Sequence, residues 1–269
     1  MVSSKVAIVG AGPAGITTAV QLKRYKINSL IFEKDKIGGL VENAHRIENT
    51  MLFPEGISGK MFVKILEDYV KKYDIDIIYE EVKKVKMTKN FVIATEKGRY
   101  EFEYLVIATG TRPKKLPFEG IKYHITEINP CDKLLIIGGG DIAFDYALSA
   151  RKMCKDITIL YRSTIKALPI LVDEAIERGI TVVKGEIKSI KNHIAHTSIG
   201  KIEFDEILGA IGRIPNVEIV EDIASSRMFI IGDAKNGIYR QTSLAIADGV
   251  KTGMKIWRMM RYGNFDGNW

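Results

Sequence analysis

The stretch VAIVGAGPAG, residues 6–15, decides the fold of this chain. Four apolar residues are followed directly by glycines at positions 10, 12 and 15, which is typical of a buried parallel strand that turns tightly into a helix. The glycines permit the turn, let the backbone approach a pyrophosphate and let the helix pack on the strand. The first N–H groups of the helix remain free to bind the anion. The stretch therefore predicts a dinucleotide-binding unit.

A second stretch of the same kind, LLIIGGGDIA, occupies residues 134–143. After each stretch come a helix, a strand, several short alternating strands and a closing apolar strand, which ends at Gly110 in the first copy and at Gly212 in the second. This duplication predicts an α/β fold with two Rossmann-like, three-layer ββα domains. Two glycine loops imply two bound dinucleotides, and two redox dinucleotides in one protein suggest that electrons pass between them.

The order of the segments predicts that the second domain is inserted in the first. We expect the first domain at residues 1–112 and 213–269 and the inserted domain at residues 113–212. The crossings between them, residues 111–113 and 213–215, each contain a proline, which fixes φ and stiffens the connection.

Composition limits the class of protein. The chain has 269 residues, 46% of them hydrophobic and 27% charged, as expected of a soluble globular protein with two domains. The net charge of +7 suits cofactor phosphates or an acidic electron carrier, although a solvated surface rich in Lys and Glu explains it more simply. No apolar run approaches the roughly 20 residues that span a bilayer. Only two cysteines are present, so a reducing cytoplasm is the expected location. We expect neither a membrane nor a nucleic acid as a partner.

Further short motifs follow the first loop in a fixed order. They are Glu33, Gly38-Gly39, RIEN (46–49), FPEGISG (53–59), ATG (108–110), GRIPN (212–216), IGDA (231–234) and YRQTSLAIADG (239–249). Together with the two glycine loops, they resemble the low-molecular-weight thioredoxin reductase group of FAD- and NAD(P)-dependent pyridine nucleotide oxidoreductases over nearly the whole chain. The resemblance implies FAD in the first domain, NADP or NAD in the inserted domain and a homodimer.

The expected FAD site rests on the chemistry of its residues and on the family resemblance. Glu33 stands 23 residues after Gly10 at the end of the second strand, where a carboxylate accepts hydrogen bonds from a ribose. A solvated strand-end glutamate is the alternative for Glu33. For Asp233, the other role is a helix N-cap, which could coexist with holding the cofactor. Many relatives have Gln where this chain has Leu40. The residues that the motifs and the resemblance assign to FAD are Gly10, Gly12, Pro13, Ala14, Gly15, Glu33, Lys34, Gly39, Leu40, Asn49, Val82, Ala108, Thr109, Gly110, Gly232, Asp233, Arg240, Gln241 and Thr242.

In the inserted domain, the position equivalent to Glu33 falls at Tyr161-Arg162-Ser163. A guanidinium there would pair with a 2′-phosphate, so Arg162 favours NADPH over NADH, with a solvated loop cation as the alternative. The residues expected to hold the nicotinamide coenzyme are Gly138, Gly140, Asp141, Ile142, Arg162 and Gly212.

The sulfur chemistry departs from the resemblance. Thioredoxin reductases of this group carry a CxxC pair before the second glycine loop, whereas this chain has only Cys131 there, seven residues before Gly138. Cys154 is expected at the end of a helix as a small buried residue, and a dithiol made by the two cysteines is the less favoured possibility. No catalytic acid, base or nucleophile is expected, because hydride transfer to a flavin needs only stacking and alignment. No metal site is expected either, because no Cys or acid set accompanies His193 and His196, and a surface hairpin explains their spacing better.

We therefore predict an FAD-dependent NAD(P)H oxidoreductase that passes electrons to a non-disulfide acceptor, either ferredoxin or a small molecule. Two alternatives stay open. One is a thioredoxin or disulfide reductase with atypical cysteine use, and the other is a flavin-binding protein without NAD(P)H turnover. The resemblance also implies that the crossings act as hinges for domain rotation.

Overall fold

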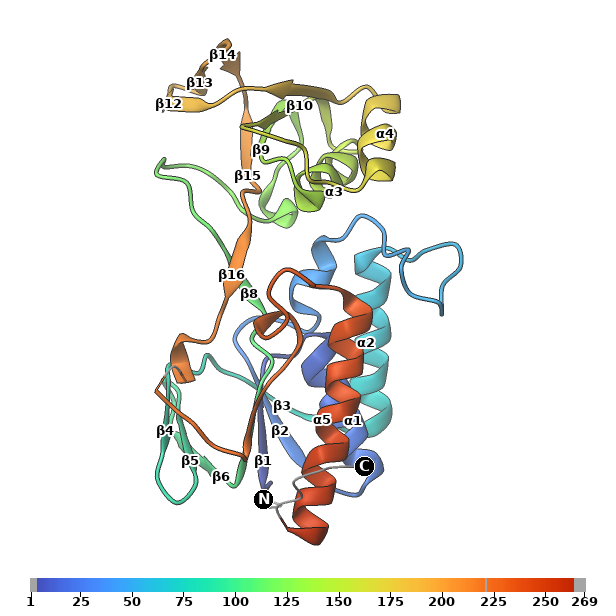
Figure 1. Ribbon diagram of the computed structural model, residues 1–269, viewed down its shortest axis with the longest axis vertical. Coiled ribbons are helices and arrows are strands. Elements are labelled where there is room, and N and C mark those ends of the chain that lie inside the picture. Colours follow the sequence, from blue (N-terminus) through green and yellow to red (C-terminus); the bar gives the residue numbers. More distant parts are fainter. Residues whose placement is uncertain (1–3, 221, 264–269) are drawn as a thin grey trace. The chain divides into compact units, whose positions relative to one another are not determined.

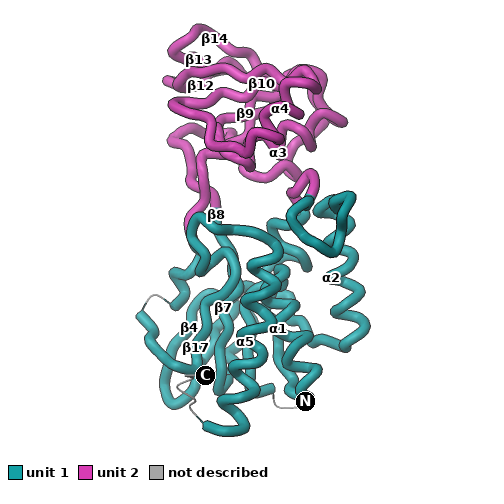
Figure 2. The backbone as a smooth tube through the Cα atoms, turned by 45° about the vertical axis from the view of Figure 1, so that its right-hand side comes forward, with its two compact units in different colours: residues 1–42, 47–112, 215–269 teal, residues 43–46, 113–214 magenta. Residues whose placement is uncertain are grey.

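The computed structural model describes residues 4–220 and 222–263 (Figure 1). It divides into two compact units (Figure 2). Unit 1 comprises residues 1–42, 47–112 and 215–269, and unit 2 comprises residues 43–46 and 113–214. The chain enters unit 2 briefly at residues 43–46, and it passes between the units again after Arg112 and after Ile214. The short strands β8 (Thr111–Pro113) and β16 (Arg213–Pro215) at these last two crossings pair with each other.

Unit 1 is built on a five-stranded parallel sheet in the order β17-β7-β1-β2-β3. Its central strand is buried along its whole length, as expected for a parallel sheet covered on both faces. The strands are β1 (Val6–Val9), β2 (Ser29–Glu33), β3 (Asp76–Tyr79), β7 (Tyr104–Ile107) and β17 (Met228–Ile230).

Helices cover one face of this sheet and a small antiparallel sheet covers the other (Figure 1). Ile8 points to the helices, whereas Ala7 and Val9 join the core shared with the small sheet. The helices are α1 (Pro13–Arg24), α2 (Gly59–Tyr73) and α5 (Thr242–Tyr262), and the small sheet consists of β4 (Lys84–Met87), β5 (Phe91–Ala94) and β6 (Arg99–Phe102).

Unit 2 repeats the three layers around a four-stranded parallel sheet in the order β11-β10-β9-β15. Leu134 and Ile136 point to its helices, and Leu135 and Ile137 point to its antiparallel sheet, following the two-residue period of a strand. The parallel strands are β9 (Cys131–Ile137), β10 (Cys154–Tyr161), β11 (Thr181–Lys184) and β15 (Glu206–Gly209). The helices are α3 (Asp141–Ala150) and α4 (Pro169–Glu177). The antiparallel strands are β12 (Ile187–Lys191), β13 (Ile194–Thr197) and β14 (Gly200–Glu203). The predicted α/β class with two Rossmann-like layer structures is confirmed.

Local predictions were right at the hairpin and wrong at one cysteine. Strands β12 and β13 are joined at Asn192 and His193, whose φ angles of 50° and 58° are those of a tight hairpin turn.

The described residues contain no group of three metal-binding side chains. Cys154 does not end a helix, because α3 stops at Ala150 and Cys154 opens β10. Within the described part of the chain, no helix is long and apolar enough to cross a membrane.

Two glycines let α5 lie very close to α1. A Cβ atom added at Gly249 would stand 2.6 Å from the carbonyl oxygen of Ala14 and 2.8 Å from Cβ of Thr17. One added at Gly253 would stand 2.8 Å from Cβ of Gln21. Real Cβ atoms do not approach other atoms this closely, so the contact between the two helices requires glycine at both positions. The contact also fixes the beginning of α5 beside the first glycine loop.

We expect Gly249→Ala to lower the free energy of unfolding by about 1–3 kcal/mol, because the new methyl group overlaps α1. A decrease in the free energy of unfolding would point to the overlap with α1, since helix propensity alone favours Ala over Gly by about 1 kcal/mol and would increase it. Urea denaturation of the variant measures the change. Gly98→Ala is the matched control, because its added Cβ meets nothing closer than 3.9 Å. A Gly249→Ala protein as stable as the wild type would contradict the packing argument.

Candidate functional site

The first glycine loop has the backbone geometry that its sequence predicts. A Cβ atom at Gly10 would stand 2.3 Å from the carbonyl oxygen of Ala108, and one at Gly15 would stand 2.0 Å from that of Gly10. Gly10 also adopts a φ of 108°, and its N–H donates to the carbonyl oxygen of Phe32 at 2.8 Å. Only glycine fits at these two positions. The loop therefore brings its backbone to the carboxyl ends of β1, β2 and β7, where such sheets bind ligands.

Glu33 is tied directly to this loop. Its side chain is only 9% exposed, and one carboxylate oxygen accepts the N–H of Ala11 at 2.8 Å while the other accepts the N–H of Asp35 at 2.9 Å. The alternative of a solvated strand-end glutamate is therefore wrong. Each carboxylate oxygen has a second lone pair, so Glu33 can hold the loop and still accept a hydroxyl hydrogen from a ribose.

The glycine pair 38–39 lies against the loop and leaves room beside it. The N–H of Gly38 donates to the carbonyl oxygen of Ala11 at 2.9 Å. A Cβ atom at Gly39 would meet nothing closer than Cα of Gly12 at 3.9 Å, and one at Gly12 would meet only the carbonyl oxygen of Gly38 at the same distance. These glycines are thus not needed for internal packing. The open space over residues 12 and 39 fits a diphosphate that is held by backbone N–H groups.

Residues far apart in sequence meet at the start of α5. The side-chain amide of Asn49 donates to the side-chain oxygen of Gln241, and the hydroxyl of Ser243 donates to the carbonyl oxygen of Asn49 at 3.2 Å. Gln241 is the N-cap residue of α5, but its side chain makes no capping hydrogen bond. The first-turn N–H groups of α5 are therefore not capped by this side chain and carry the positive end of the helix dipole.

Sequence reasoning missed Asp248. One oxygen of its carboxylate accepts both the N–H of Gly232 and the side-chain amide of Asn236 at 3.0 Å, and Lys235 lies 3.7 Å from the other oxygen. Asp248 thus holds the Gly232–Ala234 turn against α5. The motif at residues 239–249 was the available signal, but it did not say which residue bonds to which. Asp233 itself is half-buried in the turn and does not cap α5.

The remaining residues assigned to FAD also lie in unit 1, with different surroundings. Thr109 donates its hydroxyl to the carbonyl oxygen of Asn216, which joins the ATG and GRIPN motifs. Val82 has its side chain in the core, so only its backbone is available to a ligand. Lys34 is exposed directly after β2, and Leu40 and Arg240 are half-buried.

The second glycine loop repeats the first in unit 2. A Cβ atom at Gly138 would stand 2.3 Å from the carbonyl oxygen of Ala210, whereas one at Gly140 would meet nothing within 4 Å. Asp141 opens α3, and its carboxylate accepts the N–H of Leu168 at 2.9 Å. The N–H of Lys166 donates to the carbonyl oxygen of Gly139 at 2.6 Å. The segment after β10 is thus fastened to the loop, and the open position at Gly140 fits a second diphosphate.

The other residues assigned to the nicotinamide coenzyme surround this loop less closely. Arg162 is exposed and lies 3.9 Å from Glu186, a loose ion pair that contributes little on a surface. Ile142 packs at the edge of the helix-side core, and Gly212 has a φ of 112°.

The two cysteines lie at the other end of the unit 2 sheet. Cys131 is the first residue of β9 and Cys154 the first of β10, whereas the glycine loop follows the last residue of β9. Seven strand residues, at about 3.3 Å each, separate Cys131 from the loop by roughly 20 Å. A thiol at Cys131 is therefore far from the edge of the sheet where the coenzyme would bind.

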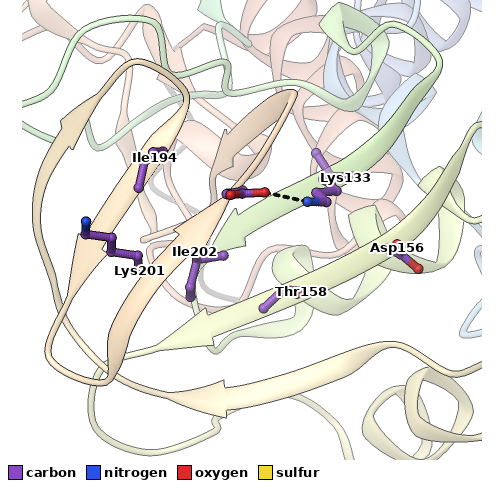
Figure 3. A pocket seen from close by; sticks show the side chains of 8 residues that line it. Lys133, Asp156, Thr158, Ile194, Lys201 and Ile202 are labelled. Carbon is purple, nitrogen blue, oxygen red and sulfur yellow. Dashed lines mark hydrogen bonds and ion pairs between the residues drawn. The ribbon is translucent and has the colours of Figure 1, made fainter.

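A shallow hollow of about 420 Å³ also lies in unit 2, but at neither glycine loop (Figure 3). It is bounded by the amino-terminal halves of β9 and β10 and by β13 and β14. Lys133 and Glu203 form an ion pair of 2.6 Å in its lining. Because ligands of such sheets bind at the carboxyl ends of the strands, we do not assign a dinucleotide to this hollow.

Asp145 is a buried carboxylate that sequence reasoning also passed over. It lies on α3 among apolar neighbours, and it accepts the N–H of His45 at 3.0 and 3.1 Å. Burial raises the pKa of Asp145 to about 6, and hydrogen bonds from the backbone of His45 and Arg46 limit that rise. Burial lowers the pKa of His45. A charged residue in the otherwise apolar run AFDYAL was the signal for this anchor of segment 43–46.

Comparisons of the sequence and of the structure with known proteins point to the same group of oxidoreductases. Residues 4–249 match the sequence profile of the pyridine nucleotide-disulphide oxidoreductase family. The chain is 31% identical to a thioredoxin reductase of Neurospora crassa, over 81% of this chain and 76% of that protein. It is 26% identical to a "34.2 kDa protein in rubredoxin operon" of Clostridium pasteurianum, over 90% and 92%. The thioredoxin reductase structure of T. acidophilum superposes with a TM-score of 0.86 at 25% identity, over 96% of this chain and 98% of that one.

We expect Asp145→Asn to remove a pH dependence of stability. The folded pKa of about 6 exceeds the ordinary value of about 3.9, so the stabilising contribution of the protonated group is complete below about pH 4 and is lost as the pH rises through 6. The loss amounts to at most about 3 kcal/mol. Urea denaturation across this range should show the free energies of wild type and variant diverging in favour of the variant. His45 titrates in both proteins and cancels.

Asp173→Asn, which removes an exposed carboxylate of α4, is the control and should follow the wild type across the same range. Parallel pH profiles for wild type and Asp145→Asn would show that ionisation of Asp145 has no cost in the folded protein.

Proposed function

The chain belongs to the pyridine nucleotide-disulphide oxidoreductase family, and from this we propose that it is an NAD(P)H oxidoreductase whose electrons leave FAD for an acceptor other than a disulfide. The protein is an oxidoreductase of the thioredoxin reductase-like type, and this type uses FAD and NADPH. When bound, FAD takes a hydride from the nicotinamide coenzyme and passes the electrons to the acceptor.

The observation that carries the proposal is the position of the sulfur atoms. The sequence contains two cysteines, and both stand at the amino ends of β9 and β10, the end of the sheet opposite the glycine loop. Because 22 residues separate them, the two cysteines do not make the CxxC pair through which thioredoxin reductases of the resembled group pass electrons. The lack of this pair supports an acceptor that takes electrons from FAD without a CxxC dithiol of this chain.

The residues of unit 1 would hold FAD by backbone contacts and a few side chains. The N–H groups at the start of α1 would bind the diphosphate, and Glu33 would accept the ribose hydroxyls. The start of α5, steadied by the Asn49–Gln241 hydrogen bond and by Asp248, would place positive helix dipole near the pyrimidine edge of the flavin, where negative charge builds up on reduction. This chemistry needs alignment and no acid, base or nucleophile, which agrees with the lack of a catalytic triad in the sequence.

A small electron carrier of negative charge is the acceptor that we favour, with a small molecule as the other possibility. The net charge of +7 would draw an acidic carrier such as ferredoxin toward the protein. The similar protein of Clostridium pasteurianum is described by its place in a rubredoxin operon, which supports a redox protein as partner. By the same resemblance we propose a homodimer, and the low cysteine count supports a cytoplasmic location.

We expect NADPH to bleach the yellow FAD-loaded protein in anaerobic stopped-flow mixing. The Cys131→Ala/Cys154→Ala double variant should turn over within about twofold of the wild type with ferredoxin, rubredoxin or a quinone, because neither thiol is on the electron path. Alkylation after reduction should trap no new thiols. Loss of turnover in the double variant would favour a disulfide reductase, and a flavin that neither NADPH nor NADH bleaches would leave only a flavin-binding protein.

The preference for NADPH rests on Arg162 and yields a paired prediction. We expect Arg162→Gln to raise KM for NADPH by roughly 10- to 100-fold and to leave KM for NADH unchanged, because a hydrogen-bonded charge pair contributes about 1.5–3 kcal/mol. Glu186→Gln should lower KM for NADPH slightly, because its carboxylate competes with the 2′-phosphate for Arg162. Lys152→Gln, a charge change after α3, is the control. Equal effects of Arg162→Gln on both coenzymes would contradict a 2′-phosphate contact.

A further inference from the structure

Cys131 and Cys154 stand directly opposite each other on neighbouring parallel strands. The register of β9 and β10 pairs the two residues, although 22 residues separate them in the sequence. Adjacent strands lie about 4.8 Å apart, and the Cα atoms of disulfide-bonded cysteines are usually about 4.4–6.8 Å apart. The backbone therefore already holds the two residues at a distance that a disulfide can span.

The two thiols also point to the same side of the sheet. Cys154 is buried in the core beneath α3 and α4, and Cys131 packs against the same core from its edge. Cys154 is close enough to help raise the pKa of the Cys131 thiol, and its sulfur lies 4.0 Å from the carbonyl oxygen of Asn129. Both side chains thus lie on the same face of the sheet, and side chains that do not point apart are the second requirement for a disulfide.

The strand ends around the pair are held firmly. The N–H of Cys131 donates to the carbonyl oxygen of Met153 at 3.2 Å, and Asp132 forms an ion pair of 2.6 Å with Lys155. The carboxylate of Asp205 accepts the N–H groups of Asp132 and Lys133 at 3.0 and 2.8 Å. These contacts keep β9 and β10 in register at their first residues, so a bond between the sulfurs needs no change of strand pairing.

We propose that Cys131 and Cys154 form a reversible disulfide that closes the β9–α3–β10 segment of unit 2. The oxidant is a small-molecule disulfide. The thiolate of one cysteine attacks it and releases one small thiol, and the second cysteine then displaces the other small thiol from the mixed disulfide. The chain loses two electrons and two protons, and the small disulfide becomes two thiols.

The bond would stabilise the coenzyme-binding segment without touching its ligand edge. The closed loop contains the second glycine loop and the whole of α3, while the sulfurs lie at the opposite end of β9. Closing a loop of this length restricts the unfolded chain. The inference concerns unit 2 alone and does not depend on the electron acceptor.

The surroundings of the pair predict how fast the bond forms. Burial raises the pKa of the Cys131 thiol to about 12, and Cys154, Glu206 and Asp205 add to the rise. Few thiolates exist at neutral pH, so exchange should be slow there and should quicken roughly tenfold per pH unit in the alkaline range. Cys131 is half-exposed and Cys154 is buried, so the small disulfide enters at Cys131.

The test starts from the fully reduced, FAD-loaded wild-type protein, treated with hydroxyethyl disulfide at about pH 9. Intact mass should fall by two hydrogens, peptide mapping should link Cys131 to Cys154, and two thiols should disappear. The melting temperature should rise by roughly 10 °C and return on treatment with dithiothreitol. Cys154→Ala should instead keep one added hydroxyethylthio group at Cys131, without the rise in melting temperature.

The mass measurement on the wild type alone decides the proposal, so an unstable variant does not affect it. A lasting mixed disulfide, or two thiols still free after prolonged treatment, would overturn the proposed bond. The proposed bond would also be overturned if the melting temperature of Cys131→Ala rose as much as that of the wild type on the same treatment. None of these readouts uses turnover, so they are distinct from any failure of the proposed function.

Discussion

In both units, the first glycine of the loop lies against the carbonyl oxygen of an alanine just beyond a neighbouring strand. A Cβ atom at Gly10 or at Gly138 would stand 2.3 Å from the oxygen of Ala108 or Ala210. This contact allows the chain to turn sharply from strand to helix without leaving the sheet. The open backbone N–H groups then stand at the carboxyl edge of the strands, where the sheet can offer them to an anion. The rest of each unit can be understood as support for that edge.

The support differs between the units. In unit 1, Glu33 holds the loop through the N–H of Ala11, and α5 approaches α1 closely enough that residues from both ends of the chain reach the same edge. In unit 2, Asp141 fastens the segment after β10 to the loop. Carboxylates thus serve as internal anchors of backbone N–H groups in both units.

Features that depend on interactions between residues close in the sequence could be predicted, whereas contacts between distant segments could not. Loop glycines, the strand before each loop and the layer order depend on local periodicity and steric limits, and these could be read before the structure was known. The anchor made by Asp248 and the one made by Asp145 could not, because each joins a side chain to backbone N–H groups of another segment. The position of Cys154 was misjudged for a related reason, since α3 ended one turn early and the following residues began a strand.

The sequence by itself determined that two dinucleotide-binding units exist, which residues form their loops and that the usual CxxC pair is missing. Those conclusions rest on residue types whose conformational freedom or chemistry is intrinsic, such as glycine at a positive φ or the number of cysteines. Only the tertiary structure decided that Cys131 and Cys154 face each other at the end of the sheet away from the loop. Strand register depends on how the hydrophobic residues of two distant strands pack together on the faces of the sheet, so the spacing of the two cysteines in the sequence did not reveal that they pair.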